Sequence, residues 1–346
     1  MEKVKYAIIG FGGIAENRVA KEGYACDTAR FASLEKAQLV GATDMNSARQ
    51  AAAEALGLKW YANMDEIFAD PAIDAVYIAT PVFCHYEQAM LALKHKRHVF
   101  MEKPITLSAK EGKKLLDAFK KAGKQLMIGY MMGYHNLHMK AREIIQSGGL
   151  GDVNLFKMQF TCWYPDIPGA WRQKRALSGG GAIMDLAVHC MELFTSITGE
   201  DFEKCTAYFT TKTFQYEVED SAVITFKSEK GILGHIDVNF NVPDNAATGK
   251  MEIYGTAGSI ITEGTLAQEE IGKMKYIYSP QGEYEAQQQR VTGKAVTYRG
   301  KGGNMYTKQF AAFGKLLLSG KLDYTNAERA LRIQELCDQM YKHNQY

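Results

Sequence analysis

The chain has 346 residues, of which 46% are hydrophobic and 23% charged, as in an ordinary globular protein with room for two domain cores. Its 41 Lys and Arg residues nearly balance 39 Asp and Glu residues, and the net charge of +2 gives no electrostatic reason to expect a nucleic-acid partner. No apolar run approaches the ~18 residues of a membrane span and no signal peptide is visible, so we expect a cytoplasmic protein with no membrane partner.

A glycine loop directly follows the first predicted strand. The apolar residues 6–9 run into Gly10-Phe11-Gly12-Gly13-Ile14-Ala15, a G-x-G-x-x-A pattern, and a helix-compatible stretch follows. Gly10 allows a tight turn, Gly12 lets the backbone approach a pyrophosphate, and the small Ala15 lets helix and strand pack closely. The unpaired N–H groups at the start of the helix attract phosphates. A bare glycine turn would also match this pattern, but its position between strand and helix favours a dinucleotide site.

The second predicted strand, residues 38–43, ends in an acidic residue. Asp44 is placed to accept hydrogen bonds from a ribose diol, and the long gap after Ala15 predicts a longer helix or an inserted loop around residues 21–33. A carboxylate here would repel a 2′-phosphate, Met45 supplies no positive charge, and Arg49 is expected on a helix surface. The sequence therefore favours NAD over NADP.

Short apolar runs and helical stretches then alternate up to about residue 129. Strands are predicted over residues 74–79, 98–101 and 125–128, and helices over residues 86–95 and 108–122. Strand–helix alternation is typical of a parallel sheet covered by helices, with ligands at the carboxyl ends of the strands. We predict an NAD-binding Rossmann domain over residues 1–129.

Residues 130–346 read as a second α/β domain with a large, mostly antiparallel open sheet. Several strands alternate apolar and polar side chains, which suits a sheet with one covered face. Strands are predicted over residues 153–163, 202–212, 222–227, 232–240 and 250–261, and helices over residues 181–196, 304–318 and 326–341. The run Gln287-Gln288-Gln289 is expected to be polar surface.

Two polar groups of the chain could carry chemistry. Lys103, in Glu102-Lys103-Pro104, follows the strand at residues 98–101 and would lie beside the cofactor crevice, although an exposed turn is an equal reading. Asp185 and His189 follow three glycines and share one face of an otherwise apolar helix. They are either a buried pair that stabilises the helix or a proton-transfer group beside an orienting carboxylate. Whether the Lys103–Pro104 bond is cis cannot be read from the sequence.

Taken together, the motifs resemble those of the glucose–fructose oxidoreductase, inositol dehydrogenase and MocA (Gfo/Idh/MocA) family of nicotinamide-dependent oxidoreductases, nearly end to end. The resemblance rests on the order of the glycine loop with Asp44, Ala79-Thr80-Pro81 with His85, Glu102-Lys103-Pro104, Gly179-Gly180-Gly181 with Asp185 and His189, and residues 253–259. It implies a Rossmann domain, a second domain that binds substrate and often forms homodimers or homotetramers through its sheet, and a carbohydrate or polyol substrate. By position it implies cofactor contacts for Gly10, Gly12, Gly13, Ile14, Asp44, Thr80, Pro81, His85, Glu102 and Lys103.

The resemblance also implies that Lys103, Asp185 and His189 surround the reacting carbon. An imidazole has an ordinary pKa near ~6.5, so His189 would accept the hydroxyl proton of a secondary alcohol while the hydride moves to the nicotinamide. The ammonium of Lys103 would stabilise the developing charge on oxygen. Asp185 would orient the substrate through another hydroxyl.

The chain departs from the family pattern after residue 128, where many members have an arginine-containing stretch. Tyr130 and His135 are candidate substrate contacts there, as is Asn136. His135 and His138 lie three residues apart but have no obvious companion ligand, and the scattered cysteines form no C-x-x-C pair, so no metal is expected. Further candidate substrate residues precede the glycines: Trp163, Trp171 and Arg172, with Tyr164 and Lys174 nearby. Aromatic rings there could stack on a sugar or simply pack a core, and the cations could bind an acidic substituent.

Three functions fit these motifs. The leading one is an NAD-dependent dehydrogenase for a ring hydroxyl of a sugar, sugar derivative, glycoside or cyclitol. A second is a glycoside-cleaving enzyme that oxidises the sugar transiently and returns the hydride. A third is a non-catalytic dinucleotide-dependent sugar sensor, which would be expected to lack Lys103 or His189, whereas both are present.

Overall fold

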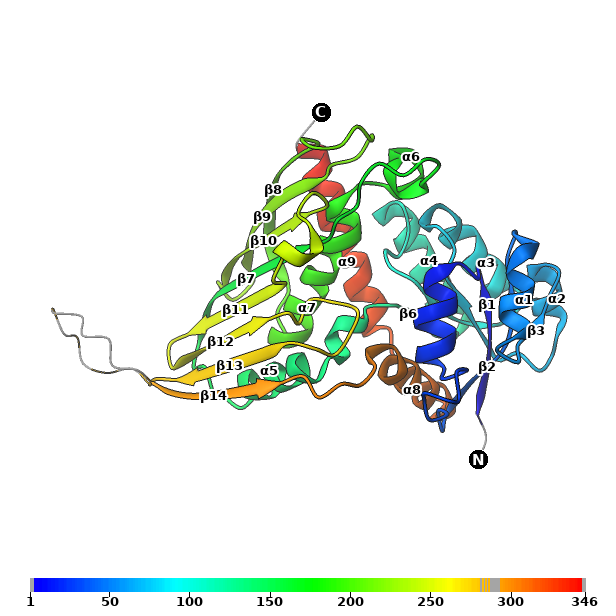
Figure 1. Ribbon diagram of the computed structural model, residues 1–346, viewed down its shortest axis with the longest axis horizontal. Helices are drawn as coiled ribbons and strands as arrows, with labels where there is room; N and C mark the ends of the chain where they lie inside the picture. The colour runs from blue at the N-terminus through cyan, green and yellow to red at the C-terminus, as the bar shows by residue number, and fades with distance from the viewer. Residues whose placement is uncertain (1–2, 281, 283, 285, 287–292, 344–346) are drawn as a thin grey trace. The chain divides into compact units, whose positions relative to one another are not determined.

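The computed structural model describes residues 3–280, 282, 284, 286 and 293–343. Its contacts divide the chain into two compact units, drawn together in Figure 1. The first unit comprises Met1–Met131, Ala176–Gly179 and Asn304–Asp338. The second comprises Met132–Arg175, Gly180–Gly303 and Gln339–Tyr346. The run Gln287-Gln288-Gln289 lies outside the described residues.

The first unit contains a parallel sheet with strand order β3-β2-β1-β4-β5-β6. The strands are β1 (Val4–Ile9), β2 (Ala37–Thr43), β3 (Lys59–Trp60), β4 (Ala75–Ile78), β5 (His98–Met101) and β6 (Leu126–Ile128). The predicted strands and their parallel arrangement are thereby confirmed. Strand β3 was not predicted, because two residues are too few to show a period.

Helices alternate with these strands, as predicted for residues 86–95 and 108–122. They are η1 (Ala15–Gly23), α1 (Gln50–Glu54), α2 (Met64–Ala69), α3 (His85–Lys94) and α4 (Ala109–Ala122), with the late helix α8 (Met305–Leu318). Helix α9 (Thr325–His343) also belongs to this unit as far as Asp338, and its last residues belong to the second unit. Local chemistry sets the ends of α4: the Ser108 side chain accepts a hydrogen bond from Glu111 N, and Gly123 adopts a left-handed φ of 63°. Between η1 and β2 the chain forms an irregular loop over residues 24–36, which is the predicted insertion.

Helix α8 completes the core of the first unit from the far end of the sequence. Phe310 is fully buried and stacks on Tyr24, with ring centroids 4.1 Å apart. It also meets Tyr77 of β4 at 5.3 Å and Phe100 of β5 at 5.1 Å, edge to face. Such aromatic contacts add to the free energy gained by burying the rings. This packing explains why residues 304–338 group with the amino-terminal sheet.

The second unit contains the large open sheet, with order β14-β13-β12-β11-β7-β10-β9-β8. Its neighbours are antiparallel except for the parallel pair β7 and β10. The strands are β7 (Val153–Thr161), β8 (Phe202–Thr210), β9 (Ser221–Ser228), β10 (Leu233–Asn239), β11 (Lys250–Gly255), β12 (Gly258–Glu263), β13 (Lys273–Tyr278) and β14 (Lys294–Arg299). The fold class is confirmed.

The prediction of one strand over residues 250–261 was wrong. The chain turns at Thr256 and Ala257, and β11 pairs with β12 in a hairpin with Gly255 opposite Gly258. A Cβ on Gly258 would lie 2.3 Å from the carbonyl oxygen of Ile277, so glycine is required by the neighbouring strand. Gly255 and Gly258 mark the turn in the sequence, but the strand-like segments on both sides of it were predicted as one strand.

Helices cover one face of the second unit's sheet, and Figure 1 shows α7 (Val188–Thr198) along that face, with α5 (Asn136–Gln146) beside it. Phe194 of α7 packs on Phe156 of β7 and Phe226 of β9. Side chains of β9 alternate between buried and exposed along the strand, as predicted for a sheet with one covered face. Within the part of the chain that the structure describes, no helix is both long and apolar enough to cross a membrane.

We predict that Phe310→Ala lowers the free energy of unfolding by about 3–5 kcal/mol, because it empties a site lined by aromatic rings. Chemical denaturation at equilibrium would measure the change. Leu318→Ala in the same helix removes a side chain that is 39% exposed and should change stability by less than about 0.5 kcal/mol. Equal effects of the two substitutions would contradict the assigned role of α8.

Candidate active site

The glycine loop after β1 has the open space that a phosphate group needs. Gly10 has a φ of 92°, and a Cβ there would lie 2.8 Å from Thr80 Cγ2 and 2.9 Å from Thr80 N. The absence of a side chain at Gly10 therefore allows both the turn after β1 and the close approach of the chain after β4. A Cβ added to Gly12 or Gly13 would have nothing within 4 Å. This open backbone at the start of a helix fits the pyrophosphate of a dinucleotide.

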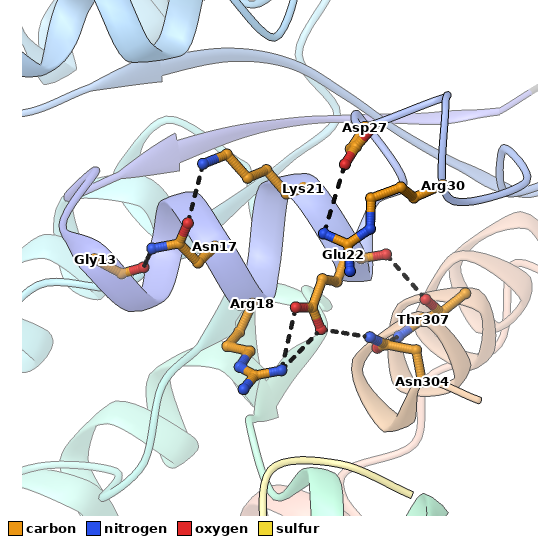
Figure 2. A network of polar contacts seen from close by, with 9 residues as sticks. All are labelled: Gly13, Asn17, Arg18, Lys21, Glu22, Asp27, Arg30, Asn304 and Thr307. Carbon is orange, nitrogen blue, oxygen red and sulfur yellow. Dashed lines mark hydrogen bonds and ion pairs between the residues drawn. The ribbon is translucent and has the colours of Figure 1, made fainter. Parts of the chain in front are cut away.

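Helix η1, which follows the loop, is held in place by a polar network shown in Figure 2. Ile14 at its N-cap position has no side-chain capping bond and is 38% exposed, so the helix start is not covered by a cap of its own. Glu22 accepts hydrogen bonds from Arg18 Nη1 at 3.1 Å and from Asn304 Nδ2 at 2.9 Å. Thr307 Oγ1 donates to the Glu22 carbonyl at 3.1 Å. Helix η1 is thus fixed to α8 at its carboxyl-terminal end.

Asp44 lies directly against the glycine loop. One carboxylate oxygen accepts the Phe11 N–H at 2.6 Å, and the other accepts the Asn46 N–H at 2.8 Å. Arg49 is engaged elsewhere, because its Nη1 lies 3.4 Å from Glu16 Oε2. The cation nearest to Asp44 in sequence is therefore already paired with a carboxylate.

His85 joins the two loops that follow β4 and β5. Its Nδ1 lies 2.9 Å from the Pro104 carbonyl oxygen, and its Nε2 lies 3.0 Å from the Thr80 carbonyl oxygen. The side chain is 1% exposed, and burial lowers its pKa to about 4. The ring is neutral at pH 7 and donates one N–H to either carbonyl. This geometry makes His85 a brace between backbone segments.

The Glu102-Lys103-Pro104 segment leaves the carboxyl end of β5, where a parallel sheet binds its ligands. Tyr77 of β4 donates a hydrogen bond from its hydroxyl to Glu102 Oε1. Burial, followed by the charge of Glu102, raises the pKa of Tyr77 well above its ordinary value, so its hydroxyl stays a donor. The Lys103–Pro104 peptide bond is cis.

In the second unit, Asp185 belongs to a cluster that also contains Arg172. Arg172 Nε lies 3.8 Å from Asp185 Oδ1, and its guanidinium covers the Trp171 ring at 4.5 Å. Burial raises the pKa of the nearby Tyr164, and the Arg172 guanidinium partly offsets that rise. A planar guanidinium suits both the stacking and the pairing. The structure therefore brings together Trp171, Arg172 and Asp185, three of the predicted substrate residues.

His189 lies one turn after Asp185, near the start of α7. Its side chain is 6% exposed, and its ring lies 6.3 Å from that of Phe160 on β7. Asp185 belongs to η6 (Ile183–Ala187), a short π-helical stretch that runs directly into α7. Wide helical turns of this kind are found frequently at functional sites.

The structure also assigns a place to a residue that sequence reasoning missed. The buried Glu219, just before β9, accepts hydrogen bonds at Oε1 from Gly181 N and Ile183 N. Nothing local in the sequence marks it, since an acidic residue before a strand is ordinary. The only indication in the sequence is the triple glycine, which implies that another segment packs closely against it but does not identify that segment as Glu219.

His135 and His138 both form structural hydrogen bonds. His135 is fully buried, with Nδ1 accepting the Leu137 N–H at 3.1 Å and Nε2 lying 3.0 Å from the Ile271 carbonyl oxygen. His138 Nδ1 donates to the Met132 carbonyl at 2.9 Å, and its Nε2 lies 3.0 Å from Thr265 Oγ1. Among the described residues, no group of three or more His, Cys, Asp or Glu side chains is arranged to hold a metal ion.

The remaining predicted residues are divided between the units. Tyr130 is 3% exposed and lies in the first unit, which also holds Thr80, Pro81 and Lys103. Trp163 is 44% exposed in the second unit, where its ring meets that of Phe214 edge to face at 5.4 Å.

Two family descriptions match the chain. Residues 4–130 match the oxidoreductase family with an NAD-binding Rossmann fold, and residues 138–261 match the GFO/IDH/MocA C-terminal domain. The two matches cover the sheets of the first and second units, up to β12.

Curated relatives match parts of the chain. The 1,5-anhydro-D-fructose reductase of Ensifer adhaerens is 26% identical over 61% of this chain and 63% of its own length. The scyllo-inositol 2-dehydrogenase (NADP(+)) of Bacillus subtilis (strain 168) is 32% identical over 37% of this chain and 36% of its own length. The match therefore spans less than two thirds of either relative.

The fold as a whole is similar to that of levoglucosan dehydrogenase, solved in complex with NADH and levoglucosan. The TM-score is 0.83 at 20% identity, and the superposition covers 99% of this chain and 97% of the other.

The burial of His138 predicts a pH-dependent loss of stability. Burial lowers its pKa to about 3, below the ordinary 6.5, so the unfolded chain binds a proton that the folded chain does not. The resulting stability is complete above pH 6.5 and is lost as the pH falls towards 3, by about 1.4 kcal/mol per unit. His138→Asn keeps a donor for Met132 and should remove the share of this one residue from the slope of the unfolding free energy between pH 6.5 and 5, to which His85 and His98 also contribute.

Chemical denaturation at several pH values would measure both profiles. His95→Asn, which removes an exposed imidazole, is the control substitution. Parallel profiles for the native chain and His138→Asn would show that this ring does not contribute the slope.

Proposed function

The chain belongs to the Gfo/Idh/MocA family of oxidoreductases, and we propose on that premise that it oxidises a ring hydroxyl of a sugar, sugar derivative, glycoside or cyclitol by reversible hydride transfer to NAD. The proposal rests mainly on the geometry of the glycine loop after β1. Gly12 and Gly13 leave open space beside a helix start, and Asp44 lies against the same loop.

The first unit supplies the residues that would hold NAD, which provides the hydride acceptor when bound. Backbone N–H groups at Gly12, Gly13 and Ile14 would hold the pyrophosphate. Glu102, kept in position by Tyr77, would accept a hydrogen bond from the nicotinamide ribose. Thr80 and Pro81 would line the groove, and His85 would brace their loop through the Thr80 carbonyl.

NAD is preferred over NADP because of the charges around Asp44. Its carboxylate would repel a 2′-phosphate, and the neighbouring Met45 is exposed and uncharged. Arg49 would have to leave Glu16 in order to compensate. Among the similar proteins, one is named for NADP(+) and another is solved with NADH, so these charges are the basis for the assignment.

Lys103, Asp185 and His189 would act on one substrate. His189 would take the proton of the reacting hydroxyl, and the Lys103 ammonium would stabilise the charge that develops on its oxygen. Asp185 would bind a second hydroxyl and orient the carbinol C–H group. Reversal of these steps gives ketone reduction.

The cluster around Arg172 supports a neutral polyol. The guanidinium is already paired with Asp185 and stacked on Trp171, so its charge is partly compensated. Such a pair offers both a donor and an acceptor to a hydroxyl group. Trp171, with Trp163 and Tyr130, would contact the C–H face of the sugar ring. His135 is left out of this site because both of its nitrogens hold backbone groups.

The open face of the second unit's sheet supports a homodimer or homotetramer. Tyr208 lies opposite Val223, and Leu233 lies opposite Lys227 on the same face. Tyr208 is 78% exposed and Leu233 is 56% exposed. Large apolar side chains on one sheet face are typical of a surface that another chain covers. The scattered cysteines of the sequence are consistent with a reducing, cytoplasmic location.

A substrate panel tests the proposed activity. We expect NADH absorbance to rise with at least one of levoglucosan, scyllo-inositol, myo-inositol, D-glucose and an aryl glucoside. Lys103→Ala and His189→Ala should each lower kcat by roughly 100-fold or more while NAD still binds. Release of aglycone without NADH would instead identify the glycoside-cleaving alternative, and NAD binding without any turnover would identify the sensor.

Asp44 variants test the cofactor assignment. Asp44→Ala should weaken NAD binding by roughly 10- to 100-fold, because a charged hydrogen-bond acceptor is lost. Asp44→Asn keeps an acceptor for Phe11 N but not the charge, so the ratio of NADP to NAD affinity should rise. Isothermal titration would measure both, with the exposed Asp65→Ala as control. Unchanged NAD affinity in Asp44→Ala would remove this residue from the ribose site.

A further inference from the structure

Glu219 holds the start of the helix that carries Asp185 and His189. It precedes β9, and its side chain is 2% exposed. Its Oε1 accepts hydrogen bonds from Gly181 N at 2.9 Å and Ile183 N at 3.0 Å. Its own carbonyl oxygen accepts the Ala182 N–H at 3.0 Å. Consecutive N–H groups at this helix start are thereby satisfied by one residue from another element.

Tyr341, in the last turns of α9, completes this arrangement. Its hydroxyl donates to Glu219 Oε1 at 2.7 Å. Its ring also lies under the Arg175 guanidinium at 5.5 Å and meets Phe209 at 5.4 Å. The ring is therefore fixed by neighbours of its own, and its hydroxyl is aimed at the carboxylate.

The triple glycine is explained by these two residues. A Cβ on Gly180 would lie 1.9 Å from Tyr341 Oη, and a Cβ on Gly181 would lie 2.0 Å from the Glu219 carbonyl oxygen. Gly179 has a φ of 78°, which other residues rarely adopt. The glycines let the helix start approach Glu219 and Tyr341 closely, and no ligand is needed to explain them.

We propose that Glu219 and Tyr341 are positioning residues that fix the helical turn from which Asp185 and His189 reach the substrate. The proposal rests on the proposed function. Asp185 lies two residues after Ile183, whose N–H is bonded to Glu219. The Asp185 N–H bonds in turn to the Gly181 carbonyl at 3.0 Å.

A change of register at this point would carry both side chains with it. Successive helical residues are about 100° apart around the axis, so re-pairing of the first N–H groups would turn Asp185 away from its place beside Arg172. A negative charge at the helix start also interacts favourably with the helix dipole. Removal of the acceptor would leave buried N–H groups unsatisfied, and the first turn would rearrange to find new partners.

The first test reads the helix without any substrate. Histidine ¹H–¹³C spectra would be recorded for the full-length chain, with the His189 peak assigned as the one lost in His189→Gln. We expect Glu219→Leu to shift or broaden the His189 peak while the His85 and His98 peaks of the first unit stay in place. A general loss of stability would instead reduce all folded peaks together. Because no substrate is used, this result is independent of the proposed function.

The conservative variants separate positioning from packing. Glu219→Gln keeps an oxygen at Oε1 for the same N–H donors, so its His189 peak should stay close to that of the native chain. Tyr341→Phe keeps the ring against Gly180 and removes the hydroxyl alone, so it should give a smaller shift in the same direction as Glu219→Leu. It also serves as the test if Glu219→Leu does not fold. Glu217→Gln, a nearby exposed carboxylate, is the matched control.

The second test uses the most active compound of the substrate panel. We expect Glu219→Leu to lower kcat by roughly 10- to 100-fold with NAD affinity unchanged, and Glu219→Gln to restore most of the loss. An unmoved His189 peak together with unchanged kcat in Glu219→Leu or Tyr341→Phe would overturn the proposal. If no compound on the panel is oxidised, the proposed function fails, and the histidine spectra still decide the role of Glu219.

Discussion

A buried polar side chain bonded to backbone groups fixes the chemistry-bearing segment of each unit. In the first unit the neutral His85 ring lies between the carbonyls of Thr80 and Pro104, in the loops after β4 and β5, and donates its one N–H to one of them. In the second unit Glu219 holds the N–H groups that begin the helix of Asp185. Both side chains are removed from water, where a backbone bond lost is not replaced by solvent. The position of each segment therefore depends on one buried residue.

Much of the first unit could be predicted because its constraints are local. The turn after β1 requires glycine, buried parallel strands read as short apolar runs, and helices between them show their own period. The same rules found the strands β7 to β10. They failed at residues 250–261, where strand-like segments lie on both sides of a short turn flanked by Gly255 and Gly258. The periodicity of apolar residues indicates which side chains are buried, but it does not indicate where the chain reverses direction.

Contacts between distant segments could not be predicted in the same way. Nothing near Phe310 indicates that it packs on β4 and β5, some 200 residues earlier in the chain. The tie between Tyr341 and Glu219 is equally non-local, and an acidic residue before a strand is ordinary. His85 was predicted to line the cofactor groove, yet its 1% exposure and its two carbonyl neighbours give it a different local task. A sequence motif indicates which residues are important for the site, but it does not show which atoms those residues contact.

The two halves of the proposed site differ in how far a sequence can describe them, and the reason is physical. A pyrophosphate is bound largely by backbone N–H groups, and backbone can approach it only where Cβ atoms are absent, so glycine positions record the ligand. A sugar hydroxyl is both donor and acceptor, and many combinations of side chains satisfy it. In the proposed site Arg172 and Asp185 would form one such combination, with Trp171 beneath the guanidinium. A different pair of side chains could bind the same hydroxyl. The glycine positions therefore indicate a dinucleotide cofactor, whereas the side chains do not identify the substrate.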